Sequence, residues 1–194
     1  MLKLEDIADV RAYEKEREEF RKHIIATKKI RRIHLGEVLT FLFENKETMR
    51  FQIQEMARAE KLYSDEQIEN ELLVYNDLIP SRNILKSTLF IELVNEEQLK
   101  EWLPKLVDIQ NHLTIEFSGN KVAGYEPDEE RLTRDEEITT SVHYIFFEFN
   151  DEQRNEFLKT KDNVKLVSSH PEYSFECELN NETIAQLQND LVGS

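Results

Sequence analysis

The chain has 194 residues, of which 39% are hydrophobic and 34% charged, with only four glycines and four prolines. This composition excludes a disordered, collagen-like or linker-rich chain, and a domain of this length folds without a disulfide or a structural metal. No apolar run reaches the ~20 residues that a bilayer-spanning helix needs, and the N-terminus lacks the apolar stretch of a signal peptide. We therefore expect a single soluble domain over residues 1–194, located in the cytoplasm and not bound to a membrane.

The formal net charge of −15 is unevenly distributed along the chain. Residues 1–63 hold 14 Lys and Arg against 12 Asp and Glu, whereas residues 64–194 hold 11 against 28. Between Glu19 and Glu37 there is no acidic residue, and six cations lie in that stretch: Arg21, Lys22, Lys28, Lys29, Arg31 and Arg32. This basic segment predicts a site for a small anion or a docking surface for an acidic partner. The alternative is a helix end whose cations complement the helix dipole and pair with the chain's own acids. The overall charge disfavours nucleic acid as a partner.

The first eighty residues predict a helix-rich part with one β-hairpin. Helices are expected over residues 4–26, 47–62 and 64–75, where helix-forming residues follow an apolar period of three to four. Ser64, followed three residues later by Gln67, is typical of a helix N-cap. Between the first two helices, β-forming residues on both sides of Gly36 and Glu37 predict a hairpin turned at these two residues. Pro80 marks the end of this part, which covers residues 1–80.

Residues 84–194 predict a sheet-rich part packed against the first. Strands are expected at 86–94, 113–117, around 122, and at 139–149, 164–167 and 173–179, with helices at 96–106, 151–159 and 182–191. Residues 128–137 predict a charged loop or helical turn. This order is typical of an α+β fold with a mainly antiparallel or mixed sheet and flanking helices. The strand at 139–149 is apolar on both faces, so we expect it at the centre of the sheet.

Familiar chemical signatures are missing from the sequence. There is no glycine-rich phosphate loop, no dinucleotide fingerprint and no His-Glu-x-x-His motif, and the five histidines are scattered without metal-ligand spacing. The single Cys177 can form neither an internal disulfide nor a multi-cysteine metal site. The sequence thus predicts no metal site and identifies no cofactor.

Two residues are candidates for proton transfer. On a helical wheel, Glu60 falls in the middle of the apolar face formed by Met49, Ile53 and Met56, where a carboxylate must be paired, metal-bound or protonated. It is either an acid, base or ligand with a shifted pKa, or one partner of an internal salt bridge. His143 lies within the expected central strand, where it is either a hydrogen-bonded core histidine or a proton-transfer group.

A second group of candidates concerns anion binding. Arg50, Gln54 and Arg58 recur every four residues and form one polar ridge on their helix. Together with Arg31 and Arg32, the two ridge arginines could hold a carboxylate or phosphate by forked hydrogen bonds. The alternative is a solvated helix face.

The run KKIRRIHLGEVLTFLFENKETMRFQIQEMARAEK, with ENELLVYNDLIP, LKSTLFIEL and SVHYIFFEF further along, resembles the bacterial family catalogued as domain of unknown function 3501. The resemblance spans nearly the whole chain in the same block order and implies no established activity. Members of that family look to be encoded beside rubrerythrin-like and iron–sulfur redox proteins, which implies a redox or peroxide-stress setting and redox proteins as partners. The family-like blocks also supply polar residues for a buried network or for a ligand cleft between the two parts: Arg31, Arg32, Glu44, Arg50, Gln52, Glu55, Arg58, Glu60, Tyr75, Asn76, Lys86, Glu92 and His143.

The sequence leaves two functions open. The first is a noncatalytic binding or accessory module whose basic segment, with Glu44 among the ligand-binding candidates, holds a small anion or a redox partner. The second is an enzyme with a cleft in which arginines orient an anion and Glu60 or His143 moves a proton. The sequence predicts neither a substrate nor an oligomeric state.

Overall fold

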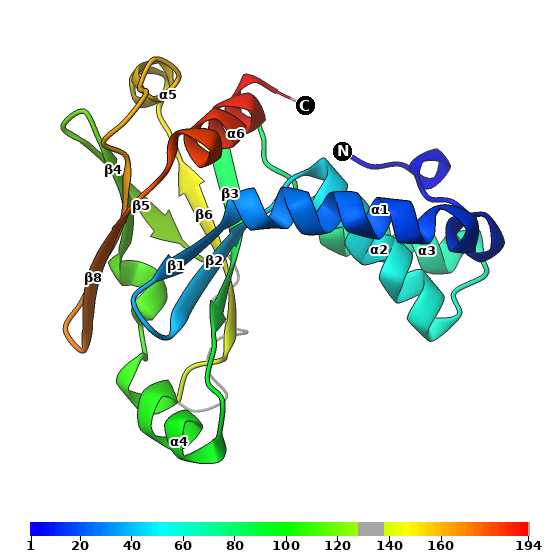
Figure 1. The fold of residues 1–194 in the computed structure, drawn as a ribbon, viewed down its shortest axis with the longest axis horizontal. Coiled ribbons are helices and arrows are strands. Elements are labelled where there is room, and N and C mark those ends of the chain that lie inside the picture. Colours follow the sequence, from blue (N-terminus) through cyan, green and yellow to red (C-terminus); the bar gives the residue numbers. More distant parts are fainter. Residues whose placement is uncertain (128–137, 194) are drawn as a thin grey trace.

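The computed structural model describes residues 1–127 and 138–193. The charged loop or turn expected at 128–137 lies outside these residues. Two regions are visible in Figure 1: a helical arm built by the N-terminal residues, and a curled sheet with helices around it. None of the helices in the described part of the chain is long and apolar enough to cross a lipid bilayer.

Three helices form the arm, preceded by a 3₁₀ turn, η1 (Leu4–Asp6): they are α1 (Val10–Arg31), α2 (Lys46–Glu60) and α3 (Asp65–Asn76). Each begins where a side-chain oxygen accepts a backbone N–H of the first turn; the capping residues are Asp9, Asn45 and Ser64. The predicted N-cap at Ser64 is therefore confirmed, with Gln67 completing the capping box. The first helix begins later than predicted because Asp9 caps it, and it continues to Arg31.

Eight strands form one sheet in which every pairing is antiparallel, which confirms the α+β fold class. The strands are β1 (Arg32–Leu35), β2 (Leu39–Phe43), β3 (Ile84–Ile91), β4 (Leu113–Phe117), β5 (Asn120–Tyr125), β6 (Val142–Glu148), β7 (Lys165–His170) and β8 (Tyr173–Glu178). Their order is β1-β2-β3-β6-β5-β4-β7-β8, so β6 lies inside the sheet as expected. Further helical segments are α4 (Glu96–Lys105), η2 (Ile109–His112), α5 (Asp151–Phe157) and α6 (Asn181–Val192).

The sheet curls until its first and last strands approach, which gives it nearly the shape of a barrel (Figure 1). Tyr173 at the start of β8 joins the two edges: its hydroxyl donates to the carbonyl of Leu35 at 2.7 Å and accepts the N–H of Val38 at 3.0 Å. Gly36 turns the β1–β2 hairpin between them, which confirms the predicted turn. Its φ is +68°, and a Cβ there would lie 2.3 Å from the Tyr173 hydroxyl oxygen, so this position requires glycine.

The two faces of the sheet build two hydrophobic cores. On β6, Ile145 and Phe147 point into the curled sheet, where α6 closes the core with Leu187. The alternate residues Tyr144 and Phe146 point outward, towards the helices of the arm. The outer face of β6 and its neighbours thus meets α2 and α3, and the cavities described below lie at this junction.

The two sequence parts are not spatially separate regions. Strands β1 and β2 belong to residues 1–80, yet β2 pairs with β3 along its whole length, from Leu39 opposite Ile91 to Phe43 opposite Ser87. The N-terminal part therefore contributes both the arm and two strands of the sheet. The organisation of residues 1–194 as a single domain stays a prediction.

Candidate functional site

A cavity of about 160 Å³, the inner cavity, lies between the arm and the outer face of the sheet. Its volume is similar to that of protein cavities that hold one benzene molecule. Six of its lining residues carry polar groups: Lys28, Glu44, Gln52, Tyr75, Thr88 and Tyr144. They come from α1, from the β2–α2 junction, from α2 and α3, and from β3 and β6.

The deepest of these groups is Glu44, which directly follows β2. Its backbone N–H donates to the carbonyl of Lys86 at 2.9 Å and so continues the β2–β3 ladder by one residue. The next residue, Asn45, caps α2, so the chain turns sharply from sheet to helix at Glu44. On β3, the alternation of side chains places Thr88 on the outer face beside it.

The carboxylate of Glu44 is only 3% exposed, yet both its oxygens have hydrogen-bond partners. The Thr48 hydroxyl donates to Oε2 at 2.6 Å, and the Thr88 hydroxyl donates to Oε1 at 2.7 Å. Burial raises the pKa of Glu44, and the two hydroxyl donors and the positive charges of Lys28 and Arg31 oppose that rise. Both of these donors are uncharged, so the hydrogen bonds to this carboxylate within residues 1–127 and 138–193 come from hydroxyls and not from a salt bridge.

A second cavity, the outer cavity, has a volume of about 490 Å³ and lies beside the first. The two share a wall formed by Tyr75, Leu78 and Tyr144. The outer cavity is bordered by Leu73 and Val74 of α3, large apolar residues that are mostly exposed. Its size falls within the range of small-molecule sites, roughly 300–1,000 Å³. Its apolar lining and its position beside a buried carboxylate resemble a ligand site.

Glu126 contributes a carboxylate to the outer cavity, and this carboxylate contacts the buried ring of His143. His143 Nδ1 lies 3.0 Å from Glu126 Oε2, and Glu126 Oε1 accepts the N–H of Tyr144 at 3.2 Å. His143 Nε2 lies 3.0 Å from the carbonyl of Thr140 and 3.1 Å from the hydroxyl of Thr139. His143 is completely buried with both nitrogens engaged, which matches the interpretation as a hydrogen-bonded core histidine.

The prediction that Glu60 points into the core is wrong. Glu60 is the last residue of α2 and is exposed. The buried positions of this helix include Ile53, Gln54 and Ala57, and the residues that follow Ala57 in the helix are exposed. Glu60 lies on α2 and His143 on β6, and neither lines any of the cavities described here.

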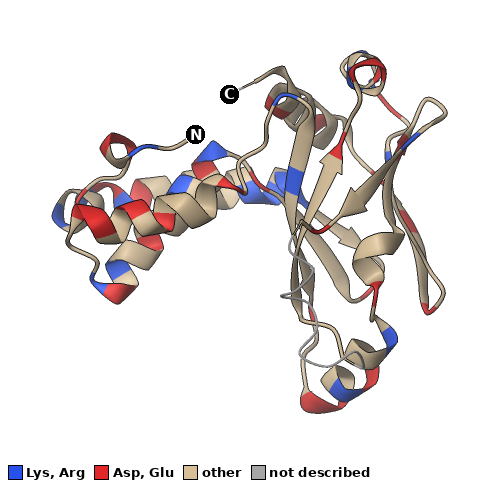
Figure 2. Ribbon diagram, turned by 180° about the vertical axis from the view of Figure 1, so that it is seen from behind, with Lys and Arg blue, Asp and Glu red and all other residues tan. Residues whose placement is uncertain are grey.

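The four candidate arginines all pair with carboxylates of the same chain. Arg32 lies 3.6 Å from Glu92, and Arg50 lies 3.0 Å from Glu16. The remaining pairs are Arg31 with Asp190 and Arg58 with Glu14. Basic and acidic residues are interspersed along the arm (Figure 2). These contacts correspond to the alternative in which the basic residues pair with the chain's own acids, and whether any of them also binds an anion stays a prediction.

Arg31 differs from the other three because it is completely buried at the end of α1. Its Nε donates to the carbonyl of Phe43 and its Nη2 to the carbonyl of Glu44, both at 2.8 Å. It thereby fixes the backbone from which the Glu44 side chain projects. Its partner Asp190 lies on α6, and burial raises the pKa of Asp190 to about 6, against the opposing effect of the Arg31 charge.

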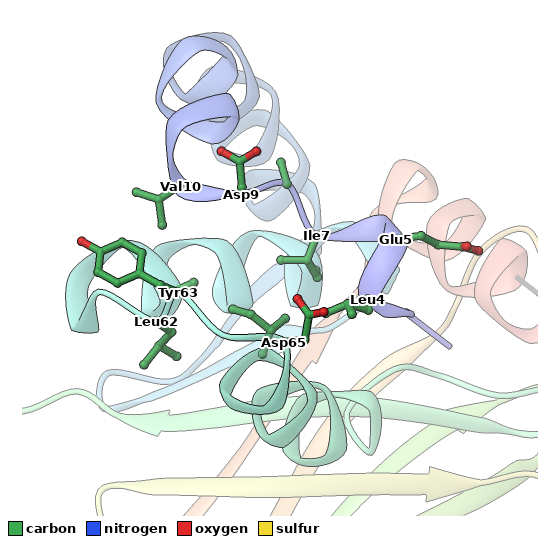
Figure 3. A pocket seen from close by; sticks show the side chains of 11 residues that line it. Leu4, Glu5, Ile7, Asp9, Val10, Leu62, Tyr63 and Asp65 are labelled. Atoms are coloured by element: carbon green, nitrogen blue, oxygen red, sulfur yellow. The ribbon is translucent and has the colours of Figure 1, made fainter.

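A third cavity, of about 500 Å³, lies at the far end of the arm. Figure 3 shows that its labelled side chains come from the N-terminal segment around Ile7 and from the α2–α3 connection around Tyr63. Its acidic residues have local structural roles: Asp9 accepts the N–H of Ala12 as the cap of α1, and Asp65 lies in the first turn of α3. We therefore do not assign a function to it.

The structure also bears on metal and thiol chemistry. Within residues 1–127 and 138–193, no three side chains of His, Cys, Asp or Glu are grouped as a metal site requires. The Cys177 thiol is partly buried on β8, and burial raises its pKa, which disfavours the reactive thiolate form.

Sequence reasoning identified part of this site. The family-like blocks named Glu44, Gln52 and Tyr75, and the structure brings these three to the inner cavity. The sequence analysis missed Thr88, Tyr144 and Glu126. The available signal was the alternation of β3 and β6, which places Thr88 and Tyr144 on the face opposite the core.

Comparisons with known proteins identify a family and a related structure. A family model described as "Protein of unknown function (DUF3501)" matches residues 1–191. A crystal structure of a protein of unknown function from Burkholderia pseudomallei K96243 is 33% identical, with a TM-score of 0.89 over 98% of each chain. No curated protein matches the chain.

Proposed function

Because the chain belongs to the family described as Protein of unknown function (DUF3501), to which that description assigns no activity, we propose a function from the cavities. The protein is a noncatalytic binding module that holds a small organic molecule between its arm and its sheet. The observation that carries this proposal is Glu44, a buried carboxylate that lines the inner cavity and whose side-chain hydrogen-bond donors are two uncharged hydroxyls. Burying a carboxylate lowers the stability of the folded state, so its presence here suggests that it has a role other than stabilising the fold.

The position of the cavities supports the same proposal. The residues of the shared wall, Tyr75, Leu78 and Tyr144, come from the arm and from the sheet. A ligand at this junction touches both regions, so its binding favours one arrangement of the arm over others. The protein thereby reports the presence of the ligand without chemical conversion.

An anion site on the basic segment has less support. Each candidate arginine already has a carboxylate partner, so an incoming anion must displace an intramolecular ion pair. We also propose that the protein acts in a redox or peroxide-stress setting, with redox proteins as its partners. In that setting burial raises the pKa of the Cys177 thiol and disfavours its reactive thiolate form.

An enzyme would have to use the Glu126–His143 pair, the acid–base arrangement nearest to the outer cavity. This pair favours the binding function, because the His143 imidazole is completely buried and bonded at both nitrogens. A general acid or base must reach the proton that it transfers. Glu126 lines the cavity, and the histidine holds it in place.

The test is a fragment-binding experiment on two tryptophan variants. Val74→Trp adds a large side chain to the border of the outer cavity, at a position that is 63% exposed in α3. Val94→Trp makes the same change at an exposed position between β3 and α4 that lines none of the three cavities. We expect uncharged aromatic fragments to shift the amide NMR signals of Tyr75 and Tyr144 in the wild type and in Val94→Trp, with this binding weakened in Val74→Trp.

The same experiment can contradict the proposal. Fragments that bind elsewhere, or that shift the Tyr75 and Tyr144 signals equally in both variants, would show that these cavities are not a binding site.

A further inference from the structure

We propose that the ligand of this site is an organic cation: a protonated amine or quaternary ammonium group on an aromatic or alkyl body. The inference deepens the proposed function and rests on it. It is carried by the charges and the aromatic rings that line the two cavities, taken together with the uncharged partners of Glu44.

The charges of the lining are mainly negative. Glu44 lies at the inner cavity, and Asp77 and Glu126, whose carboxylate also contacts His143, lie at the outer one. The described residues that line the outer cavity include no Lys, Arg or His. Each oxygen of Glu44 accepts one hydroxyl proton, and a carboxylate has capacity for about four hydrogen bonds, so an ammonium group can still be accepted. A cation here would add a charged hydrogen-bond donor to the two uncharged ones that Glu44 already has.

Aromatic rings provide the second part of a cation site. Tyr75 and Tyr144 form the shared wall, with Phe90 at the inner cavity and Phe146 at the outer one. The face of such a ring attracts a cation within about 6 Å. Phe146 already makes this interaction within the protein, because the Lys86 ammonium lies 4.8 Å from its ring centroid.

Lys28 is the one cation that lines the inner cavity, and it opposes a positively charged ligand. Its side chain is half-buried, and its Nζ lies 5.5 Å from the centroid of Phe51, a ring outside both linings. The ammonium is therefore held at the border of the cavity by another ring. Removing this charge tests whether the ligand is positively or negatively charged, because Lys28→Met strengthens the binding of a cation and weakens that of an anion.

Three probes of one size separate the possible ligand charges: benzylammonium, benzyl alcohol and benzoate. We expect benzylammonium to bind the full-length wild type about tenfold more tightly than benzyl alcohol, as a charged hydrogen bond predicts, and benzoate to bind more weakly than either. Calorimetric titration at pH 7.5 gives the affinities, and amide NMR shifts at Tyr75 and Tyr144 locate the binding. The comparison needs no variant, so it holds even if a substitution at Glu44 impairs folding.

Two substitutions then test the role of Glu44. Glu44→Gln keeps the size and removes the charge, with one hydroxyl contact reversed because the amide nitrogen donates, and it should reduce the preference for benzylammonium over benzyl alcohol about tenfold. Glu60→Gln makes the same change at an exposed carboxylate on the same arm and should leave the preference intact. Lys28→Met should increase the affinity for benzylammonium.

The possible failures are distinguishable. If none of the three probes, nor any neutral fragment, binds at Tyr75 and Tyr144, the proposed function itself fails. If benzyl alcohol or benzoate binds there as tightly as benzylammonium, the site exists and the cation assignment is wrong. The same conclusion follows if Glu44→Gln leaves the preference unchanged.

Discussion

At the scale of single residues, the least expected feature is a charged pair that joins the first helix, α1, to the last helix, α6. Arg31 ends α1, Asp190 lies near the C-terminus, and Arg31 is completely buried where they meet. Burying an ion pair gives little net stability, because the desolvation of both groups opposes their attraction. The carbonyls of Phe43 and Glu44 satisfy other donors of Arg31, so the pair also fixes the chain at the base of the inner cavity.

Asp190 predicts a specific pH dependence of stability. Burial raises its pKa from 3.8 to about 6, so the folded state binds the proton more tightly than the unfolded state between these values. The free energy of unfolding therefore falls as the pH rises from about 4 to about 6. Asp190→Asn removes the titrating carboxyl group. The free energy of unfolding of this variant, measured by urea unfolding from pH 4 to 7, should therefore depend less on pH than that of the wild type. Some dependence remains because the pKa of Glu44 is raised too.

The control for this prediction is Asp162→Asn, at an exposed carboxyl. It should retain the slope of the wild type. An Asp190→Asn variant with an unchanged slope would mean that Asp190 keeps an ordinary pKa in the folded protein.

At the scale of elements, the polar ridge of α2 shows what a helical wheel can and cannot give. The wheel placed Arg50, Gln54 and Arg58 correctly on one face, but it carries no information on what covers that face. The partners are distant in sequence: Arg50 donates to the carbonyl of Asp6 at 2.9 Å, and Gln54 bonds both the N–H and the carbonyl of Ala8. The ridge therefore forms the contact between α2 and the N-terminal segment, which we call the Gln54 seam. Gln54 itself is only 1% exposed.

The Gln54 seam can be tested directly. Gln54→Ala removes an accepted bond of 2.8 Å and a donated bond of 3.0 Å, and we expect a loss of about 2 kcal/mol in the free energy of unfolding. Gln54→Glu keeps the acceptor but sets a buried negative charge against the carbonyl of Ala8, so its loss at neutral pH should be larger than that of Gln54→Ala. Hydrogen exchange at the Ala8 amide should become faster in Gln54→Ala, and unchanged exchange would contradict a role for Gln54 in holding the N-terminal segment.

At the scale of the whole molecule, local signals predicted most elements, whereas the site depended on long-range pairing. The strand at 113–117 and the cap at Ser64 follow from neighbouring residues alone, and both are confirmed. The inner cavity instead requires β2, β3 and β6 to lie side by side beneath the arm, an order that no local pattern contains. For this reason Glu126 was missed, and Glu60 was assigned to the core from the wheel of one helix.

The closure of the curled sheet is a property of the whole molecule, and it depends on one hydroxyl. Tyr173→Phe removes the bonds to Leu35 and Val38 and leaves two buried backbone groups unpaired, which should cost about 2 kcal/mol of unfolding free energy. Tyr63→Phe is the matched control, because Tyr63 is 74% exposed, and it should leave the stability unchanged. Urea unfolding of the two variants and the wild type measures both effects.

Gly36 provides the decisive comparison. Gly36→Ala forces a Cβ at a φ of +68° to within 2.3 Å of the Tyr173 hydroxyl oxygen, so it should destabilise the wild type strongly. In the Tyr173→Phe background that oxygen is absent, and the same substitution should cost less, although the contact with the Phe175 ring at 2.9 Å remains. The two changes should therefore be non-additive in a double-mutant cycle. Additive costs would show that the turn and the tyrosine do not act together in joining β1 to β8.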